Sequence, residues 1–136
     1  MATKIFVNLP VKDLKKTMEF FTVLGFKFNS KFTDENAACM IISEDHIYAM
    51  LLVEKFFKSF IKKEIADAKK STEVLLALSV ESRGTVDQMM KLWLEAGGKE
   101  AREKQDLGFI YSRALEDLDG HIWEIFYMDE SRMPKK

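Results

Sequence analysis

The sequence predicts an α+β fold made of two βαβββ modules, and a repeated pattern carries this prediction. Each half opens with an alternating strand, continues with an amphipathic helix that ends at glycine, and closes with three further strands. The last strands also begin alike, with HIYAML at 46–51 and HIWEIF at 121–126. Neither half could bury both faces of its sheet alone, so we expect a single domain over 1–136.

Module one is expected at about 1–53. Its first strand, 4–11, has the period of two that a half-buried strand requires. Alternation places Ile5, Val7, Leu9 and Val11 on one face and Phe6 and Asn8 on the other. Asp13 can cap the following helix, which buries Leu14, Met18 and Phe21 and ends at Gly25. Further strands are predicted near 26–33, 37–43 and 46–53.

Module two is expected at about 72–130. The strand 74–80 again alternates, with Leu75, Ala77 and Ser79 on one face. A helix over about 85–96 buries Val86, Met89, Met90 and Trp93 and ends at Gly97–Gly98. Strands are predicted near 98–102, 109–116 and 121–127, and the segment 117–120, Asp-Leu-Asp-Gly, forms the last hairpin turn.

A connecting helix is expected at about 54–71, because Phe57, Ile61 and Ile65 fall on one helical stripe within 54–70. The simplest interpretation is a helix docked on the sheet. A mobile lid over a pocket, a partner-binding helix, and a helix that lies on a membrane surface are the alternatives.

Composition narrows the partners and the location. The chain has 136 residues, 47% hydrophobic and 32% charged, with a net charge of −1. This balance offers no basic excess for nucleic acid or for an anionic membrane. No apolar run is long enough to span a bilayer, and the N-terminus lacks a signal-peptide pattern. The single cysteine, Cys39, favours a reducing, cytoplasmic location.

Two segments resemble the vicinal-oxygen-chelate superfamily, which includes the glyoxalase, bleomycin-resistance and extradiol-dioxygenase proteins. They are NLPVKDLKKTMEFFTVLGFKF at 8–28 and DLDGHIWEIFYMD at 117–129. The resemblance covers nearly the whole chain and implies that the two modules form a cupped mixed sheet, the glyoxalase/bleomycin-resistance-like fold. Homodimers are common in that superfamily, so a homodimer is expected by analogy.

The resemblance also implies four metal-ligand positions, two in each module. Counting from the family motifs places them at Phe6, Leu75, Glu124 and, least surely, Ala49. Divalent metals need about four to six nitrogen, oxygen or sulfur donors. Only Glu124 offers one, so the sequence predicts no metal at this site and no cofactor. Metal-assisted chemistry of the family kind would then lack its main electrostatic contribution.

Glu124 needs a partner, because an unpaired buried carboxylate is costly. If 117–120 is a four-residue turn, Arg113 lies directly opposite Glu124, and Tyr111 lies opposite Phe126. Three interpretations of the Arg113–Glu124 pair stay open. The pair could only satisfy the inner face of the sheet, it could recognise a polar ligand, or Glu124 could serve as an acid–base catalyst.

Other polar groups are weaker candidates. Asn8 shares a face with Phe6 and could bond either to a ligand or to the neighbouring backbone. His46 and His121 each begin the last strand of a module. Cys39 lies in an apolar strand, so buried packing is favoured over nucleophilic work.

The leading hypothesis is a bleomycin-resistance-like protein that binds a small molecule without metal. The ligand would contact Phe6, Asn8, Tyr111, Arg113 and Glu124. One alternative is a glyoxalase-superfamily lyase, isomerase or transferase, either metal-dependent or using Glu124. The other is a protein-interaction domain whose cup is filled by its own side chains.

Overall fold

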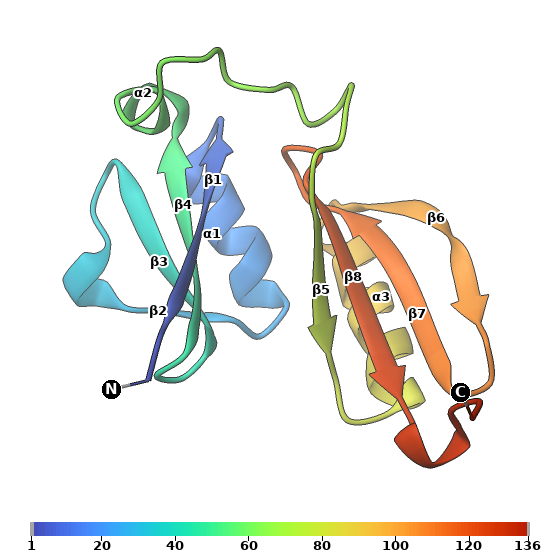
Figure 1. Ribbon diagram of the computed structural model, residues 1–136. Helices are drawn as coiled ribbons and strands as arrows, with labels where there is room; N and C mark the ends of the chain where they lie inside the picture. The colour runs from blue at the N-terminus through green and yellow to red at the C-terminus, as the bar shows by residue number, and fades with distance from the viewer. Residues whose placement is uncertain (1, 136) are drawn as a thin grey trace. The chain divides into compact units, whose positions relative to one another are not determined.

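The computed structural model describes residues 2–135, which divide into two compact units with the boundary between Ala66 and Asp67. Each unit contains one four-stranded mixed sheet with one long helix against it (Figure 1).

Unit 1 contains the predicted βαβββ order, preceded by no other element among the described residues. Its elements are β1 (Ile5–Val11), α1 (Leu14–Val23), β2 (Lys27–Phe28), a 3₁₀ turn η1 (Ser30–Phe32), β3 (Ala37–Ser43), β4 (Ile47–Val53) and α2 (Glu54–Lys58). The sheet order is β1-β4-β3-β2, and β1 and β4 run parallel. The other strand pairs are antiparallel.

Unit 2 repeats this arrangement. Its elements are β5 (Leu75–Ser79), α3 (Arg83–Glu95), β6 (Lys99–Asp106), β7 (Ile110–Glu116), β8 (Ile122–Met128) and a 3₁₀ turn η2 (Glu130–Arg132). The sheet order β5-β8-β7-β6 is that of unit 1, and β5 and β8 form its parallel pair. The predicted α+β fold of two βαβββ modules is therefore confirmed.

The helices begin and end where the sequence indicates. Asp13 caps α1, and its carboxylate accepts a hydrogen bond from the Lys16 amide at 3.1 Å. Ser82 caps α3 in the same way through the Thr85 amide. Gly25 and Gly97 follow the two helices with φ of +99° and +109°, a conformation that favours glycine.

Each helix covers one face of its sheet, and that face holds the most buried side chains. In unit 2, Trp93 of α3 lies 6.2 Å from Trp123 of β8, between ring centroids, and both rings are buried. The Trp93 indole N–H donates to the Glu116 carbonyl at 2.7 Å, and the Trp123 indole N–H donates to the Asp117 carboxylate at 3.0 Å. These bonds fix the β7–β8 turn against the helix.

The connecting helix expected over 54–71 is wrong in extent. Only Glu54–Lys58 is helical. The helix lacks a side-chain cap at Val53, and Lys58 and Lys62 would place like charges one turn apart if it continued. Further on, the Asp67 carboxylate accepts the Lys69 amide at 3.0 Å, a local turn that competes with a helix.

The strand expected near 26–33 is also shorter than predicted. Strand β2 covers only Lys27–Phe28, and the chain then enters the turn η1. The Asn29 side chain causes this change, because its oxygen accepts the Lys31 amide at 3.0 Å. Among the described residues, no helix is both long and apolar enough to cross a membrane.

Candidate binding face of the second sheet

The face of the unit 2 sheet that α3 leaves uncovered carries the candidate site, and we call it the helix-free face. The strand register fixes which side chains share it. Ala77, Glu124, Ala114 and Arg102 lie side by side across the four strands, and Ser79, Phe126 and Ser112 form the next row. The row on the other side contains Leu75, Ile122 and Glu116.

Glu124 is paired with Arg102 from the edge strand β6. The Arg102 guanidinium donates to Glu124 Oε2 at 2.5 Å and to the Ser112 hydroxyl at 3.3 Å. It also donates to the carbonyl of Glu103 at 3.0 Å. The Glu124 side chain is 22% exposed, so solvent reaches the carboxylate although its base is packed in the sheet. This ion pair is the charged centre of the helix-free face.

The predicted pairing of Arg113 with Glu124 is wrong. Arg113 lies opposite Ile125, and Glu124 lies opposite Ala114. Tyr111 likewise lies opposite Tyr127 rather than Phe126. A shift of one residue moves a side chain to the other face of a sheet. Arg113 and Tyr111 therefore lie on the face that α3 covers, away from Glu124.

The turn between β7 and β8 explains the shift. The Asp117 amide donates to the His121 carbonyl at 3.0 Å, so five residues, 117–121, separate the strands where four were predicted. The Asp117 carboxylate holds the turn by accepting the Asp119 amide at 2.9 Å and the His121 amide at 3.1 Å. Burial raises the pKa of Asp117.

Arg113 and Tyr111 instead join a polar network beneath α3. The Tyr111 hydroxyl donates to Asp87 at 2.5 Å, and Arg113 donates to Asp87 at 3.2 Å and to Glu100 at 3.1 Å. Burial, followed by the bond to Asp87, raises the pKa of Tyr111. Burial alone lowers the pKa of Arg113, but its bonds to Glu100 and Tyr111 outweigh this and leave the pKa raised. The network ties α3 to β6 and β7.

Phe6 and Asn8 share the face of the unit 1 sheet with Tyr48 and Met50, as the β1–β4 register requires. The Phe6 ring stacks on Tyr48 with centroids 4.7 Å apart and an interplanar angle of 10°. The Asn8 amide donates to the Phe6 carbonyl at 3.0 Å, the backbone alternative raised above. These two residues and Glu124 belong to different units.

Ala49 is not the counterpart of Glu124. It pairs with Val7 and is fully buried on the other face, whereas Met50 pairs with Asn8 as Glu124 pairs with Ala77. Strands β4 and β8 therefore correspond to each other with a difference in residue number that is one smaller than the sequence comparison suggested. Met50 thus occupies the position that corresponds to Glu124. Its side chain offers only a thioether sulfur, which is a soft and weak metal donor.

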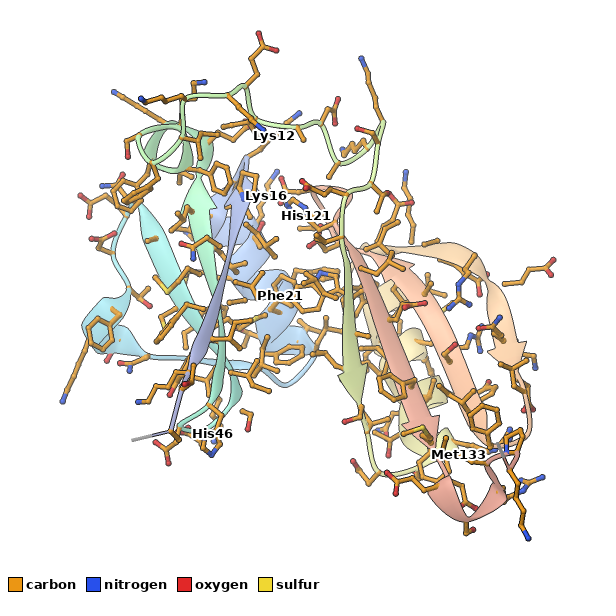
Figure 2. All side chains as sticks on the ribbon, viewed as in Figure 1. Lys12, Lys16, Phe21, His46, His121 and Met133 are labelled. Atoms are coloured by element: carbon orange, nitrogen blue, oxygen red, sulfur yellow. The ribbon has the colours of Figure 1, made fainter. Side chains whose placement is uncertain are left out.

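The positions implied for a metal do not fit one. Phe6 and Leu75 have no donor atom, and Glu124 already binds Arg102. Within residues 2–135, no group of three or more His, Cys, Asp or Glu side chains is placed to hold a metal ion. His46 lies at the β3–β4 turn and His121 at the β7–β8 turn (Figure 2).

Cys39 is buried in β3, as predicted, and burial raises the pKa of its thiol. A raised pKa keeps the sulfur protonated and unreactive near neutral pH. Cys39 therefore contributes packing rather than nucleophilic chemistry.

Sequence reasoning missed Arg102. The predicted strand ended at that residue, but β6 continues to Asp106, and nearly all its side chains are exposed. Such an edge strand gives no hydrophobic periodicity, and its register shifts twice against β7. The only feature of the sequence that could have indicated this role is the positive charge of Arg102, which lies in a segment that could pair near the Glu124 carboxylate.

Comparisons with known proteins agree with the fold. A family model described as bleomycin resistance protein-like N-terminal matches residues 3–43. A hypothetical protein from S. aureus is 27% identical, with a TM-score of 0.77, over 93% of this chain and 95% of that one. A glyoxalase-related enzyme from Fulvimarina pelagi is 18% identical, with a TM-score of 0.77, over 93% and 88% of the two chains.

The genomically encoded fosfomycin resistance protein of Listeria monocytogenes is 15% identical, with a TM-score of 0.68, over 96% of this chain and 97% of that one. A search of curated proteins finds no significant match. The chain thus has the α+β fold of the vicinal-oxygen-chelate superfamily, and the resemblance seen in the sequence is confirmed. Its N-terminal 41 residues, 3–43, point more narrowly to the bleomycin-resistance-like proteins.

Proposed function

We propose that the chain is a bleomycin-resistance-like protein that binds a small organic molecule without a metal. The observation that carries the proposal is the Arg102–Glu124 pair on the helix-free face. The pair lies among alanine, serine and apolar side chains, and a few polar groups that fix the orientation of a ligand are typical of a small-molecule site. Glu124 stands where the superfamily resemblance implies a metal ligand, and a guanidinium occupies its neighbourhood instead.

The ligand contacts that we propose differ from the sequence-based set. Glu124 stays, and Arg102 replaces Arg113 as its partner. Tyr111 leaves the set because its hydroxyl is bonded to Asp87 beneath α3. Phe6 and Asn8 belong to unit 1 and are not part of this set, although Phe6 is 48% exposed.

Metal analysis tests the metal-free part of the proposal. The purified chain is incubated with nickel, zinc, manganese or iron(II), desalted and measured for bound metal, beside Glu124→Ala and the exposed-helix control Glu95→Ala. We expect no stoichiometric metal in any of the three. One metal per chain that is lost in Glu124→Ala and kept in Glu95→Ala would return a metal-dependent lyase, isomerase or transferase to first place.

Ligand binding is tested by a thermal-shift screen of small aromatic and aliphatic compounds. A compound that binds only the folded state raises Tm, and the rise grows with the logarithm of its concentration above Kd. We expect such compounds to lose their effect in a variant of the helix-free face, Ala77→Leu, which adds bulk on the exposed side of Glu124. Absence of any stabilising compound in a broad screen would favour the interaction-protein alternative.

A further inference from the structure

The helix-free face leaves one oxygen of Glu124 open. Among residues 2–135, Arg102 is the only hydrogen-bonding partner of the Glu124 side chain, and it bonds to Oε2. Oε1 therefore accepts no hydrogen bond from the described part of the chain. An ionised carboxylate can accept about four hydrogen bonds. Glu124 thus retains acceptor capacity, while Arg102 already donates to three groups.

The sheet surface beside Glu124 is exposed on the β5 side, at Ala77 and Ser79, and buried on the β7 side, at Ala114 and Ser112. The two neighbours of Glu124 across the strands are Ala77 and Ala114, whose side chains are single methyl groups. Phe126 follows two residues later on the same face, and its cross-strand neighbours are Ser79 and Ser112. A flat group could therefore lie on the Phe126 ring beside the exposed Ser79 and reach Glu124 two residues away along β8.

The pair also decides which charge the site favours. Arg102 uses three of its five N–H donors, on one oxygen of Glu124, on Ser112 and on the Glu103 carbonyl. An incoming anion would find at most two unused N–H groups on Arg102 and would face the Glu124 charge. An N–H donor meets an open acceptor, and a charged donor strengthens the bond to about twice that of a neutral one.

We propose that the helix-free face of the second sheet binds an aromatic compound with an amidinium or ammonium group. The N–H group donates to Glu124 Oε1, and the ring lies on Phe126. Arg102 acts as a positioning residue that orients the carboxylate and moderates its attraction for cations. This inference rests on the proposed small-molecule function and names the ligand class for the same site.

The test uses three probes of one shape and different charge: benzamidine, benzamide and benzoate. Binding to the full chain is measured by isothermal titration calorimetry at low ionic strength. We expect the affinity to fall in the order benzamidine, benzamide, benzoate. Glu124→Gln should weaken benzamidine about tenfold, since a hydrogen bond between charged groups contributes about 1.5–3 kcal/mol and 1.4 kcal/mol is a factor of ten. Its effect on benzamide should be small.

Arg102→Ala supplies a second, opposite test. Removing the cation leaves the Glu124 charge uncompensated, so benzamidine should bind several times more tightly. Phe126→Leu should weaken all three probes by about two- to tenfold through the loss of aromatic contact. Arg113→Met removes a cation from the opposite face and should leave every affinity unchanged. Circular dichroism verifies that each variant is folded.

Each remaining outcome separates this inference from the proposed function. Preferential binding of benzoate that is lost in Arg102→Ala and gained in Glu124→Gln would overturn the ligand class but keep the small-molecule site. No binding of benzamidine together with hits of other chemistry in the thermal-shift screen would also overturn only the ligand class. No binding of the probes and no hit in the screen would overturn both proposals.

Discussion

In unit 1 the central row of the uncovered sheet face contains Asn8, Met50 and Cys39, whereas in unit 2 the same row contains Ala77, Glu124 and Ala114. The two sheets have the same strand order, so these two rows occupy corresponding positions and can be compared residue by residue. Unit 1 fills its row with a thioether, a thiol and an amide bonded to its own backbone. In unit 2, the two residues beside the Glu124 carboxylate are alanines, whose side chains are single methyl groups.

The two units also differ in where they carry charged side chains. On the helix-covered face, unit 2 contains a hydrogen-bonded network of Arg113, Tyr111 and Asp87. The buried side chains of α1 in unit 1 are three apolar residues and Thr17. Unit 2 thus contains ion pairs on both faces of its sheet. In the network near α3, Asp87 accepts hydrogen bonds from both Tyr111 and Arg113, whereas on the helix-free face Glu124 leaves one oxygen open.

The largest effect is expected from two neighbours in β8 that lie on opposite faces. Trp123→Ala removes a ring that is 1% exposed and its bond to Asp117, so we expect the free energy of unfolding to fall by about 3–5 kcal/mol. Glu124→Gln should lower the free energy of unfolding by less than about 1 kcal/mol, since its ion-pair partner Arg102 has a side chain that is 38% exposed. Urea denaturation measures both. A Glu124→Gln cost above 2 kcal/mol would make the pair structural.

Glycine substitutions separate steric from backbone effects in the two units. A Cβ at Gly98 would lie 2.2 Å from the Trp93 ring and 2.7 Å from the Glu116 carbonyl oxygen. Gly98→Ala should therefore destabilise by about 1–3 kcal/mol. At Gly25, with φ of +99°, a Cβ meets nothing within 4 Å, so Gly25→Ala should cost about 1 kcal/mol from the backbone alone. Thermal unfolding of both variants gives the comparison, and a smaller loss for Gly98→Ala would contradict it.

Arg113→Met tests whether the two ion pairs of unit 2 have different roles. The side chain is 19% exposed and donates to Asp87 and Glu100, which are 55% and 39% exposed. Because water can solvate both freed carboxylates, we expect a loss of about 1 kcal/mol in unfolding free energy. Stability is measured by urea denaturation. A loss of ligand affinity in this variant, with stability unchanged, would restore the sequence-based site.

The sequence predicted the repeat, the helices and the faces of β1 and β5, because hydrophobic periodicity determines these features. It failed at the β7–β8 register, because one extra residue in the turn moves Arg113 to the other face. That length depends on a hydrogen bond from the Asp117 amide to the His121 carbonyl, which periodicity does not encode. Arg102 was missed for a related reason, since the exposed strand β6 gives no pattern from which to derive register.

Asp106 provides a pH-dependent contrast on the exposed edge of unit 2. Two bonds from Arg83, at 2.8 and 2.9 Å, hold the pKa of Asp106 well below its usual range. A lowered folded-state pKa adds stability above the unfolded value of about 4, and this stability is lost as the pH falls below it. Asp106→Asn should therefore be slightly less stable than the wild type at pH 7 and converge with it in acid. Urea denaturation at pH 7 and pH 2.5 measures this convergence, and an equal difference at both values would contradict it.

The smallest effect on stability is expected in the segment after α2. Phe60 is 68% exposed, and its ring contacts Phe56 at 5.0 Å between centroids. Because little apolar surface is removed from water, Phe60→Ser should change the unfolding free energy by less than about 0.5 kcal/mol. Phe21→Ser, at a fully buried ring of α1, is the matched control and should unfold the chain or cost several kcal/mol.

The same Phe60 variant distinguishes a bare surface from a covered one. Sedimentation of wild type and Phe60→Ser over a range of concentrations measures self-association beside the unfolding experiment. If the Phe60 ring is not part of an interface, the wild type and Phe60→Ser should sediment alike and be equally stable. Stability that rises with protein concentration in the wild type alone would mean that a second copy covers Phe60. The segment 54–63 would then belong to an interface, and the ligand site on the second sheet would remain a separate question.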